Sequence, residues 1–346
     1  MGTRFPNHVD KDRITVNLTC QEQRPRIRNL FIHHLPTPPA DLQREVLDGL
    51  TRPVKQLPPK LFYDERGSQL FDAITELPEY YVTRTEAQIF HQHERAIHDR
   101  IPPDAVLIEP GSGNCQKARA LLQKAQIATY VPVEISASHL ITATHALAKE
   151  FPRIAIHAVC GDFTQTQQLP QTVPERPRVV FFPGSTIGNF EPPAALRLLR
   201  RMRNWLGQDG GLLIGVDTRK DPSVLHAAYN DAQGITAVFN LNMLHHLNRT
   251  LGTHFKPELF EHEAVFNERL GRIEMHLRSR QDQRVRVAGQ WIEFRAGESI
   301  HTENSYKYAP EDFAELATQA GFQHRQCWQD ERGYFSVHWL NVEASL

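Results

Sequence analysis

The chain has 346 residues, with 39 basic and 40 acidic side chains, a formal net charge of −1 and 40% hydrophobic residues. Such a balanced charge creates no overall field toward nucleic acid or an anionic membrane surface, so a small, specific ligand is the better expectation. The N-terminus lacks the apolar core of a signal peptide, and nowhere do eighteen apolar residues follow one another. We therefore expect a cytoplasmic protein without a membrane segment, long enough for two domains.

The first part of the chain is expected to be irregular and then partly helical. Residues 1–24 show no periodicity and predict a polar arm, whereas 41–50 carry one apolar stripe typical of a helix. Residues 58–64 are aromatic and are expected to be extended. Farther on, Thr83 or Thr85 is expected to cap a helix that continues toward Arg100.

From residue 105 onward, short apolar segments alternate with helical ones, which is typical of a parallel sheet with crossover connections. The expected strands are 105–109, 129–134, 154–159, 178–182 and 211–217, and the expected helices are 116–123, 136–149, with Ser136 as N-cap, and 194–206. A helical region at 224–248 and strands at 260–266, 273–280 and 284–294 then leave this pattern. A helix at 310–320 and a hairpin of 323–329 with 334–342 close the chain, and the hairpin could form an antiparallel edge of the sheet.

A glycine-containing loop, Glu109-Pro110-Gly111-Ser112-Gly113, connects the first of these strands to a helix. Glycine lets the backbone approach a ligand there, and the helix N-terminus offers free amide donors. A tight turn without a ligand is the simpler alternative. Glu134, about twenty residues on, could accept hydrogen bonds from ribose hydroxyls, while Asp162 and Phe163 could contact an adenine. Together these residues favour a nucleoside-containing ligand.

The same outline would fit a dehydrogenase that binds a dinucleotide. A pyrophosphate needs a third glycine in the loop, and that position is Gln116. The carboxylate of Glu109 would also repel a pyrophosphate but suits the ammonium of S-adenosylmethionine. The loop therefore favours a methyl donor over a nicotinamide.

A second candidate site follows the fourth strand, where Gly184 and Gly188 flank a turn that ends at Asn189. Together with Tyr63, Tyr80 and Tyr81, this turn could bind a small polar ligand. The alternative is that Asn189 only caps the helix after Pro192-Pro193.

Neither the cysteines nor the histidines predict a metal centre or a disulfide framework. The four cysteines are scattered without a C-x-x-C pair. The densest histidine group, His91, His93 and His98, has spacings that point the rings to different helix faces. We therefore predict no metal.

Several longer runs, spread from about residue 40 to the C-terminus, carry a family resemblance. They are Lys60-Leu61-Phe62-Tyr63-Asp64, Gly67-Ser68, Leu70-Phe71-Asp72, the run from Leu77 to Ala87, the run from Glu109 to Lys117, Cys160-Gly161-Asp162-Phe163, the run from Gly184 to Asn189, Ala228-Tyr229-Asn230-Asp231 and Arg272-Ile273-Glu274-Met275. In this order they closely resemble the histidine Nα-methyltransferase family of ergothioneine biosynthesis.

The resemblance implies an α/β fold with a Rossmann-like class I methyltransferase sheet, an antiparallel C-terminal edge and a discontinuous α+β substrate-binding domain. Residues 85–217 and 309–346 would form the S-adenosylmethionine-binding domain, and 25–84 and 218–308 the substrate-binding domain. The implied reaction is trimethylation of free L-histidine, through its mono- and dimethyl forms, to hercynine, the first step of ergothioneine biosynthesis. A monomer is favoured, without nucleic-acid or membrane partners.

Residue by residue, the resemblance assigns the donor to Gly111, Lys117, Glu134, Asp162 and Phe163. Glu134 departs from the usual Asp, and Pro110 from the usual Leu. For the amino acid, the implied residues are Tyr80, Asn189 and Tyr229 at the carboxylate, Tyr63 at the amine in a catalytic role, Met275 in the pocket, and Glu303 with Ser305 at the imidazole. The spacing of two agrees with this last pair, because alternate residues of an extended segment share a face.

Two alternatives remain open at this point. Another amino acid such as tryptophan could be the acceptor, although an indole has no basic nitrogen and would not favour Glu303. The chain could also be a ligand-binding module without catalytic activity on the same fold. Without the family, Glu303 would look like an ordinary surface carboxylate. Methylation of nucleic acid ranks lower, given the balanced charge.

Overall fold

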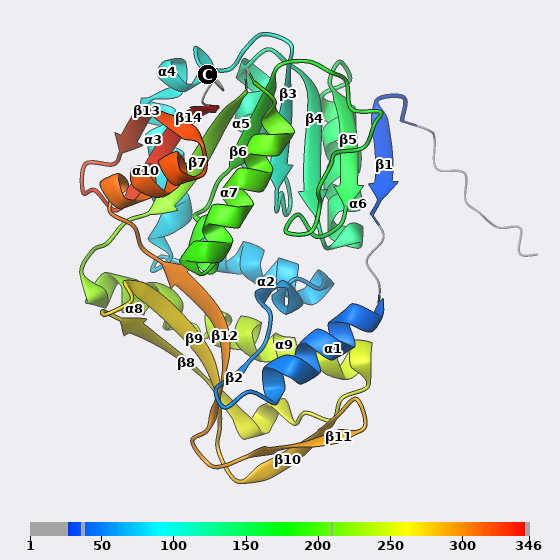
Figure 1. Ribbon diagram of the computed structural model, residues 1–346, viewed down its shortest axis with the longest axis vertical. Helices are drawn as coiled ribbons and strands as arrows, with labels where there is room; N and C mark the ends of the chain where they lie inside the picture. The colour runs from blue at the N-terminus through cyan, green and yellow to red at the C-terminus, as the bar shows by residue number, and fades with distance from the viewer. Residues whose placement is uncertain (1–26, 36–38, 209, 343–346) are drawn as a thin grey trace, which may run out of the picture.

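The computed structural model describes residues 27–35, 39–208 and 210–342, and the expected arm at 1–24 lies outside them. The described chain forms a large sheet flanked by helices and a smaller part with its own sheet (Figure 1). Within these residues, no helix is long and apolar enough to cross a membrane. Nor do the described residues contain a group of three or more His, Cys, Asp or Glu side chains placed to hold a metal ion.

The large sheet confirms the predicted α/β architecture. Its strands are, in spatial order, β1 (Leu30–His34), β5 (Ala155–Cys160), β4 (Ile127–Glu134), β3 (Ala105–Pro110), β6 (Arg178–Phe182), β7 (Gly211–Asp217), β14 (Phe335–Val342) and β13 (Phe322–Gln329). The first six are parallel, whereas β14 pairs antiparallel with β7 and β13 antiparallel with β14. The strand order reverses at β3, and ligands bind beyond the carboxyl ends of strands at such a reversal.

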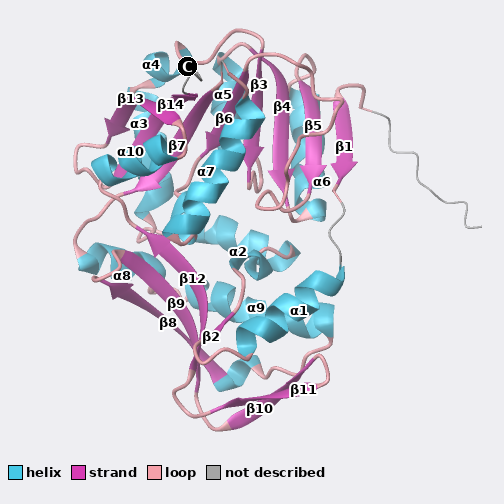
Figure 2. Cartoon of the chain, in the orientation of Figure 1, coloured by secondary structure: helices cyan, strands magenta, loops and turns pink. Residues whose placement is uncertain are grey.

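Helices cover both faces of this sheet, as Figure 2 shows. They are α3 (Tyr81–Gln92), α4 (Glu94–His98), α5 (Gln116–Lys124), α6 (Ala137–Glu150), α7 (Pro192–Leu206) and α10 (Pro310–Gln319). All of β3 is buried, as expected for a strand covered on both sides. Because successive side chains alternate, Val106 joins the cluster that contains Leu199 of α7, and Leu107 joins the cluster that contains Leu121 of α5.

The smaller part of the protein is inserted between β7 and α10 and is completed by residues that precede α3. Its sheet has the order β2 (Lys55–Gln56), β12 (Ser299–Tyr306), β9 (Arg272–Ser279) and β8 (Phe260–Asn267), beside the hairpin of β10 (Gln283–Val287) and β11 (Gln290–Phe294). Its helices are α1 (Pro39–Leu50), α2 (Glu65–Thr75), α8 (Pro222–Tyr229) and α9 (Ile235–Leu251), with short 3₁₀ helices η1 (Pro59–Phe62) and η3 (Pro257–Leu259). A further 3₁₀ helix, η2 (Thr186–Asn189), follows β6.

Several local expectations were wrong. Helix α3 begins at Tyr81, so Thr83 and Thr85 lie inside it, and it ends at Gln92 instead of continuing toward Arg100. Thr85 is buried, and its packing outweighs its preference for a cap position. The expected extended segment 58–64 contains η1, and the expected strand 284–294 is a hairpin that turns at Ala288 and Gly289, both with positive φ.

Strand β1 was not expected and changes the division of the chain. It pairs in parallel with β5, Leu30 opposite Ile156, at the edge of the large sheet. The expected substrate-binding range 25–84 therefore includes a strand of the large sheet. A five-residue edge strand with Phe31 and Ile32 exposed has no clear alternation from which to predict it. The other domain ranges stay a proposal.

Candidate active site

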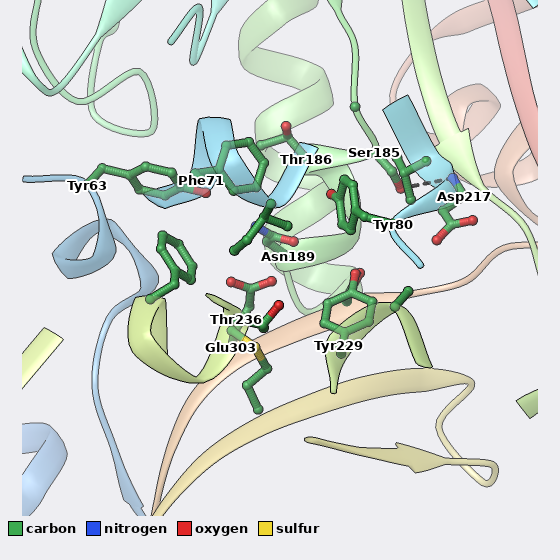
Figure 3. A pocket seen from close by; sticks show the side chains of 17 residues that line it. Tyr63, Phe71, Tyr80, Ser185, Thr186, Asn189, Asp217, Tyr229, Thr236 and Glu303 are labelled. Carbon is green, nitrogen blue, oxygen red and sulfur yellow. Dashed lines mark hydrogen bonds between the residues drawn. The ribbon is translucent and has the colours of Figure 1, made fainter. Parts of the chain in front are cut away.

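A cavity lies between the carboxyl edge of the large sheet and the smaller part of the protein. Every residue that the resemblance assigned to the amino acid lines it, namely Tyr63, Tyr80, Asn189, Tyr229, Met275, Glu303 and Ser305. Figure 3 shows Asn189 and Glu303 between Tyr63 and Phe71 on one side and Tyr80 and Tyr229 on the other. Segments far apart in the sequence thus meet around one small volume.

Asn189 reaches the cavity because the chain turns sharply after β6. Gly184 and Ser185 both have positive φ, 78° and 60°, and lead into η2, which ends at Asn189. A Cβ on Gly188 would lie 2.7 Å from the carbonyl oxygen of Tyr306, so only glycine lets η2 pack this closely on β12. Glu191, not Asn189, is the N-cap residue of α7, so the capping alternative is wrong.

Glu303 and Ser305 share one face of β12, as their spacing predicts. Glu303 is only 9% exposed, although its residue type is typical of surfaces. Burial raises the pKa of its carboxyl group to about 7, and the charge of Lys307 partly opposes this rise. Ser305 accepts a hydrogen bond from the hydroxyl of Tyr229 over 2.7 Å.

The cavity tyrosines are neutral phenols near neutral pH. Burial raises the pKa of Tyr63, Tyr80 and Tyr229 well above the usual value, and the nearby Glu303 carboxylate raises each further. The ring of Tyr63 lies edge-on to Phe71, with centroids 6.0 Å apart, which fixes the direction of its hydroxyl. In this neutral form the phenols can donate hydrogen bonds to a ligand.

The candidate donor loop lies next to this cavity, at the carboxyl ends of β3, β4 and β5. Gly111 has φ +67°, and a Cβ there would lie 3.3 Å from the ring of Phe163. The amide of Gly113 donates to one carboxylate oxygen of Glu134 at 2.9 Å, and the other oxygen accepts from the amides of Ile135 and Ser136. Ser136 occupies the N-cap position of α6, but its side chain makes no capping bond.

The carboxylates at this edge of the sheet differ in the hydrogen bonds that they already accept. One oxygen of Asp162 accepts from the amide and hydroxyl of Thr164, at 2.8 and 2.6 Å. Glu109 is fully buried and accepts a hydrogen bond from Tyr130, and burial raises the pKa of its carboxyl group to about 8. Its contact with the donor ammonium stays a prediction.

Lys117 and Glu86 connect the donor loop to the acceptor cavity. The ammonium of Lys117 lies 2.8 Å from one oxygen of Glu86, and the other oxygen accepts from the amide of Gly184 at 2.7 Å. Glu86 was not among the site residues predicted from the sequence. The only hint of a role for Glu86 was its place within the run from Leu77 to Ala87. Its side chain is 4% exposed, and nothing in the sequence of a single helix predicts that a carboxylate will be buried.

An ion-pair network under the cavity was also missed. Asp217, the last residue of β7, is fully buried between the ammonium groups of Lys220 and Lys307, each 2.6 Å away, and accepts from the hydroxyl of Tyr81. Burial alone would raise the pKa of Asp217, but the two lysines outweigh it and hold that pKa below its usual value. The amide of Asp217 donates to Ser185 at 2.9 Å.

Comparison with known proteins identifies the family. The model of the histidine-specific, S-adenosylmethionine-dependent methyltransferases matches residues 42–342. The chain belongs to this family. It is 43% identical over 302 residues to a histidine N-alpha-methyltransferase of Mycolicibacterium smegmatis, and 39% identical over 302 residues to one of Mycobacterium tuberculosis. Both alignments cover 86% of this chain and 93% of the relative.

A third relative is longer. The chain is 33% identical over 284 residues to ergothioneine biosynthesis protein 1 of Neurospora crassa, an alignment that covers 79% of this chain and 32% of that protein. The family is defined by its use of S-adenosylmethionine, and the loop fits this donor. Nothing lies within 4 Å of a Cβ placed on Gly113, so open space borders the loop beside Glu134.

Proposed function

We propose that the protein transfers three methyl groups from S-adenosylmethionine to the α-amine of free L-histidine, which gives hercynine in the first step of ergothioneine biosynthesis. One observation carries the proposal. The residues assigned to the amino acid, from Tyr63 to Ser305, line a single cavity next to the donor loop. The family of the chain supports the same acceptor.

The donor is proposed to bind along the carboxyl ends of β3, β4 and β5. Glu134 would accept hydrogen bonds from the ribose hydroxyls, and Asp162 with Phe163 would contact the adenine. Gly111 lets the backbone pass close to the methionyl group, and Lys117 would neutralise its carboxylate. When bound, the donor supplies an electrophilic methyl group on a sulfonium centre.

The acceptor is proposed to be held at both ends. Tyr80 and Asn189 would donate to the carboxylate, and Tyr229 would lie beside them with its hydroxyl still donating to Ser305. Glu303 and Ser305 would bind the imidazole, and Met275 would pack against it. These contacts with the carboxylate and the ring hold the molecule without using its α-nitrogen. This matters because each added methyl group removes a possible hydrogen bond at that nitrogen.

Catalysis by this site is mainly a matter of orientation. The neutral amine attacks the methyl carbon with its lone pair, while the C–S bond breaks and its electrons stay on the sulfur. An ammonium has no lone pair, so before each transfer the amine must lose a proton, which passes to water. The raised pKa of Tyr63 gives this phenol the role of a hydrogen-bonding group that orients the amine.

A mass-spectrometric assay tests the proposed reaction. The purified protein is incubated with S-adenosylmethionine and each free amino acid, tryptophan included. We expect a gain of three methyl groups on histidine, with the mono- and dimethyl forms as intermediates. Methylation of a different amino acid alone would refute the proposed acceptor. Donor binding without any methyl transfer would instead support a module without catalytic activity.

A cytoplasmic location and a monomeric state stay predictions. Both concern properties that lie outside the cavity and its chemistry. Size-exclusion chromatography with light scattering would give a mass near the 39.7 kDa of one chain if the monomer prediction holds.

A further inference from the structure

Lys307 is a buried lysine immediately after β12. Its side chain is 0% exposed, and its ammonium donates to Asp217 at 2.6 Å, to Ser305 at 2.8 Å and to Tyr229 at 3.2 Å. An ammonium has three donors and no acceptor, so each N–H of Lys307 has a partner. The oxygens of Ser305 and Tyr229 must therefore accept from it.

The hydrogen bond from Lys307 determines whether Ser305 donates or accepts its further hydrogen bonds. Its oxygen accepts from Lys307 and also from Tyr229, which donates over 2.7 Å. A hydroxyl oxygen has two lone pairs, and both are now used. The remaining group is the hydroxyl hydrogen of Ser305, and Ser305 lines the cavity. Ser305 thus presents a donor to the acceptor molecule.

Glu303 provides the opposite hydrogen-bonding group on the same face of β12. An ionised carboxylate only accepts hydrogen bonds, so Glu303 needs an N–H from the ligand. A neutral imidazole carries one N–H and one unprotonated nitrogen. An imidazolium carries two N–H groups and no unprotonated nitrogen, whereas an indole carries only its single N–H. The donor of Ser305 and the acceptor of Glu303 together match the neutral imidazole.

We propose that Lys307 is a positioning residue that fixes Ser305 as a hydrogen-bond donor to the unprotonated ring nitrogen, so that the cavity selects a neutral imidazole. The proposal rests on the proposed function, because it takes histidine as the acceptor. Asp217 holds Lys307 from the end of β7, and the hydroxyls come from β12 and α8. Through its contacts with Asp217 and Ser305, Lys307 therefore connects β12, the proposed ring-binding strand, to the large sheet.

Lys220 offers a matched control within the same network. It also pairs with Asp217 at 2.6 Å, and its side chain is only 2% exposed. Its other hydrogen bonds go to the hydroxyl of Tyr81 and the carbonyl of Thr218, away from Ser305 and Tyr229. Replacing either lysine by methionine removes one charge from Asp217, but only Lys307→Met removes the contact with Ser305.

Calorimetric titration of histidine in the presence of S-adenosylhomocysteine tests the proposal without turnover. Lys307→Met is expected to lower histidine affinity about tenfold or more, and Lys220→Met to stay within about threefold of the wild type. In a Ser305→Ala background, the effect of Lys307→Met should largely disappear, because both changes remove the same interaction. The proposal would be overturned if Lys307→Met lowered histidine affinity equally in the wild-type and Ser305→Ala backgrounds, or if Lys307→Met and Lys220→Met lowered it equally.

Affinity for S-adenosylhomocysteine reports whether each variant is folded. If Lys307→Met fails to bind it, Lys307→Gln takes its place, because its shorter, uncharged side chain still offers an N–H donor on the side of Ser305. That variant should keep histidine affinity within about threefold of the wild type, and a tenfold loss would count against the proposal. A wild-type protein that does not bind histidine would contradict the proposed function itself, so the two failures are distinguishable.

Discussion

Glu303 and Ser305 show how two residues acquire a function from their surroundings. Their spacing places both on one face of β12, yet spacing alone does not bury them. In the structure Glu303 is 9% exposed and lies close enough to three buried phenols to raise their pKa. Burial makes a hydrogen bond to this carboxylate selective, because an unpaired polar group in the cavity is costly.

The raised pKa of Glu303 predicts a pH-dependent affinity for histidine. The carboxyl group loses its proton only as the pH rises through about 7, and the ionised form is the one that accepts the imidazole N–H. Replacing it in Glu303→Gln should cost about tenfold or more in histidine affinity at pH 8. The ratio of wild-type to variant affinity should shrink as the pH falls to 6. Calorimetry at several pH values measures this ratio.

Protonation of the imidazole ring of the ligand also changes with pH, but it affects the wild type and the variant equally. It therefore cancels in the ratio of the two affinities. Donor affinity serves as the control and should be the same in wild type and variant. A ratio that does not change between pH 6 and pH 8 would contradict the role of the ionised carboxylate, even if histidine affinity fell.

At the scale of elements, a glycine in β7 makes room for a large ring from the antiparallel edge strand β14. Gly211 begins β7, and a Cβ there would lie 2.3 Å from the indole ring of Trp339 in β14. The glycine thus leaves room for the ring on the face of the sheet. Trp339 is buried and donates to Asn341 at 2.7 Å, which holds the ring in this place.

Gly211→Ala is therefore expected to lower the free energy of unfolding by about 1–3 kcal/mol through overpacking. Denaturant unfolding measures the change. The double variant with Trp339→Leu should lose less stability than the sum of the two single changes, because the smaller side chain leaves space for the new methyl group. Additive losses would show that the ring of Trp339 is not what the methyl group meets.

Across the whole molecule, buried side chains connect the candidate donor loop with the acceptor cavity. Glu86 contacts Lys117 of the donor site with one oxygen and the amide of Gly184 beside the acceptor cavity with the other. Asp217 and Lys307 connect the end of β7 to the ring-binding strand in a similar way. We therefore predict that binding at one site depends on the geometry of the other.

Glu86→Gln tests this link, because the neutral amide removes the ion pair with Lys117. Affinities for both S-adenosylmethionine and histidine are expected to fall, each by about three- to tenfold, and calorimetry measures them separately. Glu94→Gln is the matched control, since Glu94 pairs with Lys124 in an exposed ion pair outside both sites. An effect on the donor alone would mean that Glu86 serves only Lys117.

The sequence by itself determined the strands of the large sheet from β3 to β7 and, through the family resemblance, the residues assigned to the amino acid. The predicted strands from 105 to 217 agree with β3 to β7 within two residues at each end, because buried parallel strands are continuous apolar runs between glycine and proline turns. The residues that the family resemblance assigned to the amino acid all line one cavity.

Only the tertiary structure decided the features that depend on distant contacts. Strand β1 exists because β5 offers it an edge, and α3 begins at Tyr81 and not at a threonine cap. The burial of Glu303 and the pairing of Lys307 with Asp217 and Ser305 join segments that no local pattern relates. Local periodicity sets which elements form, whereas long-range packing sets the burial and hydrogen bonds that give the cavity its chemistry.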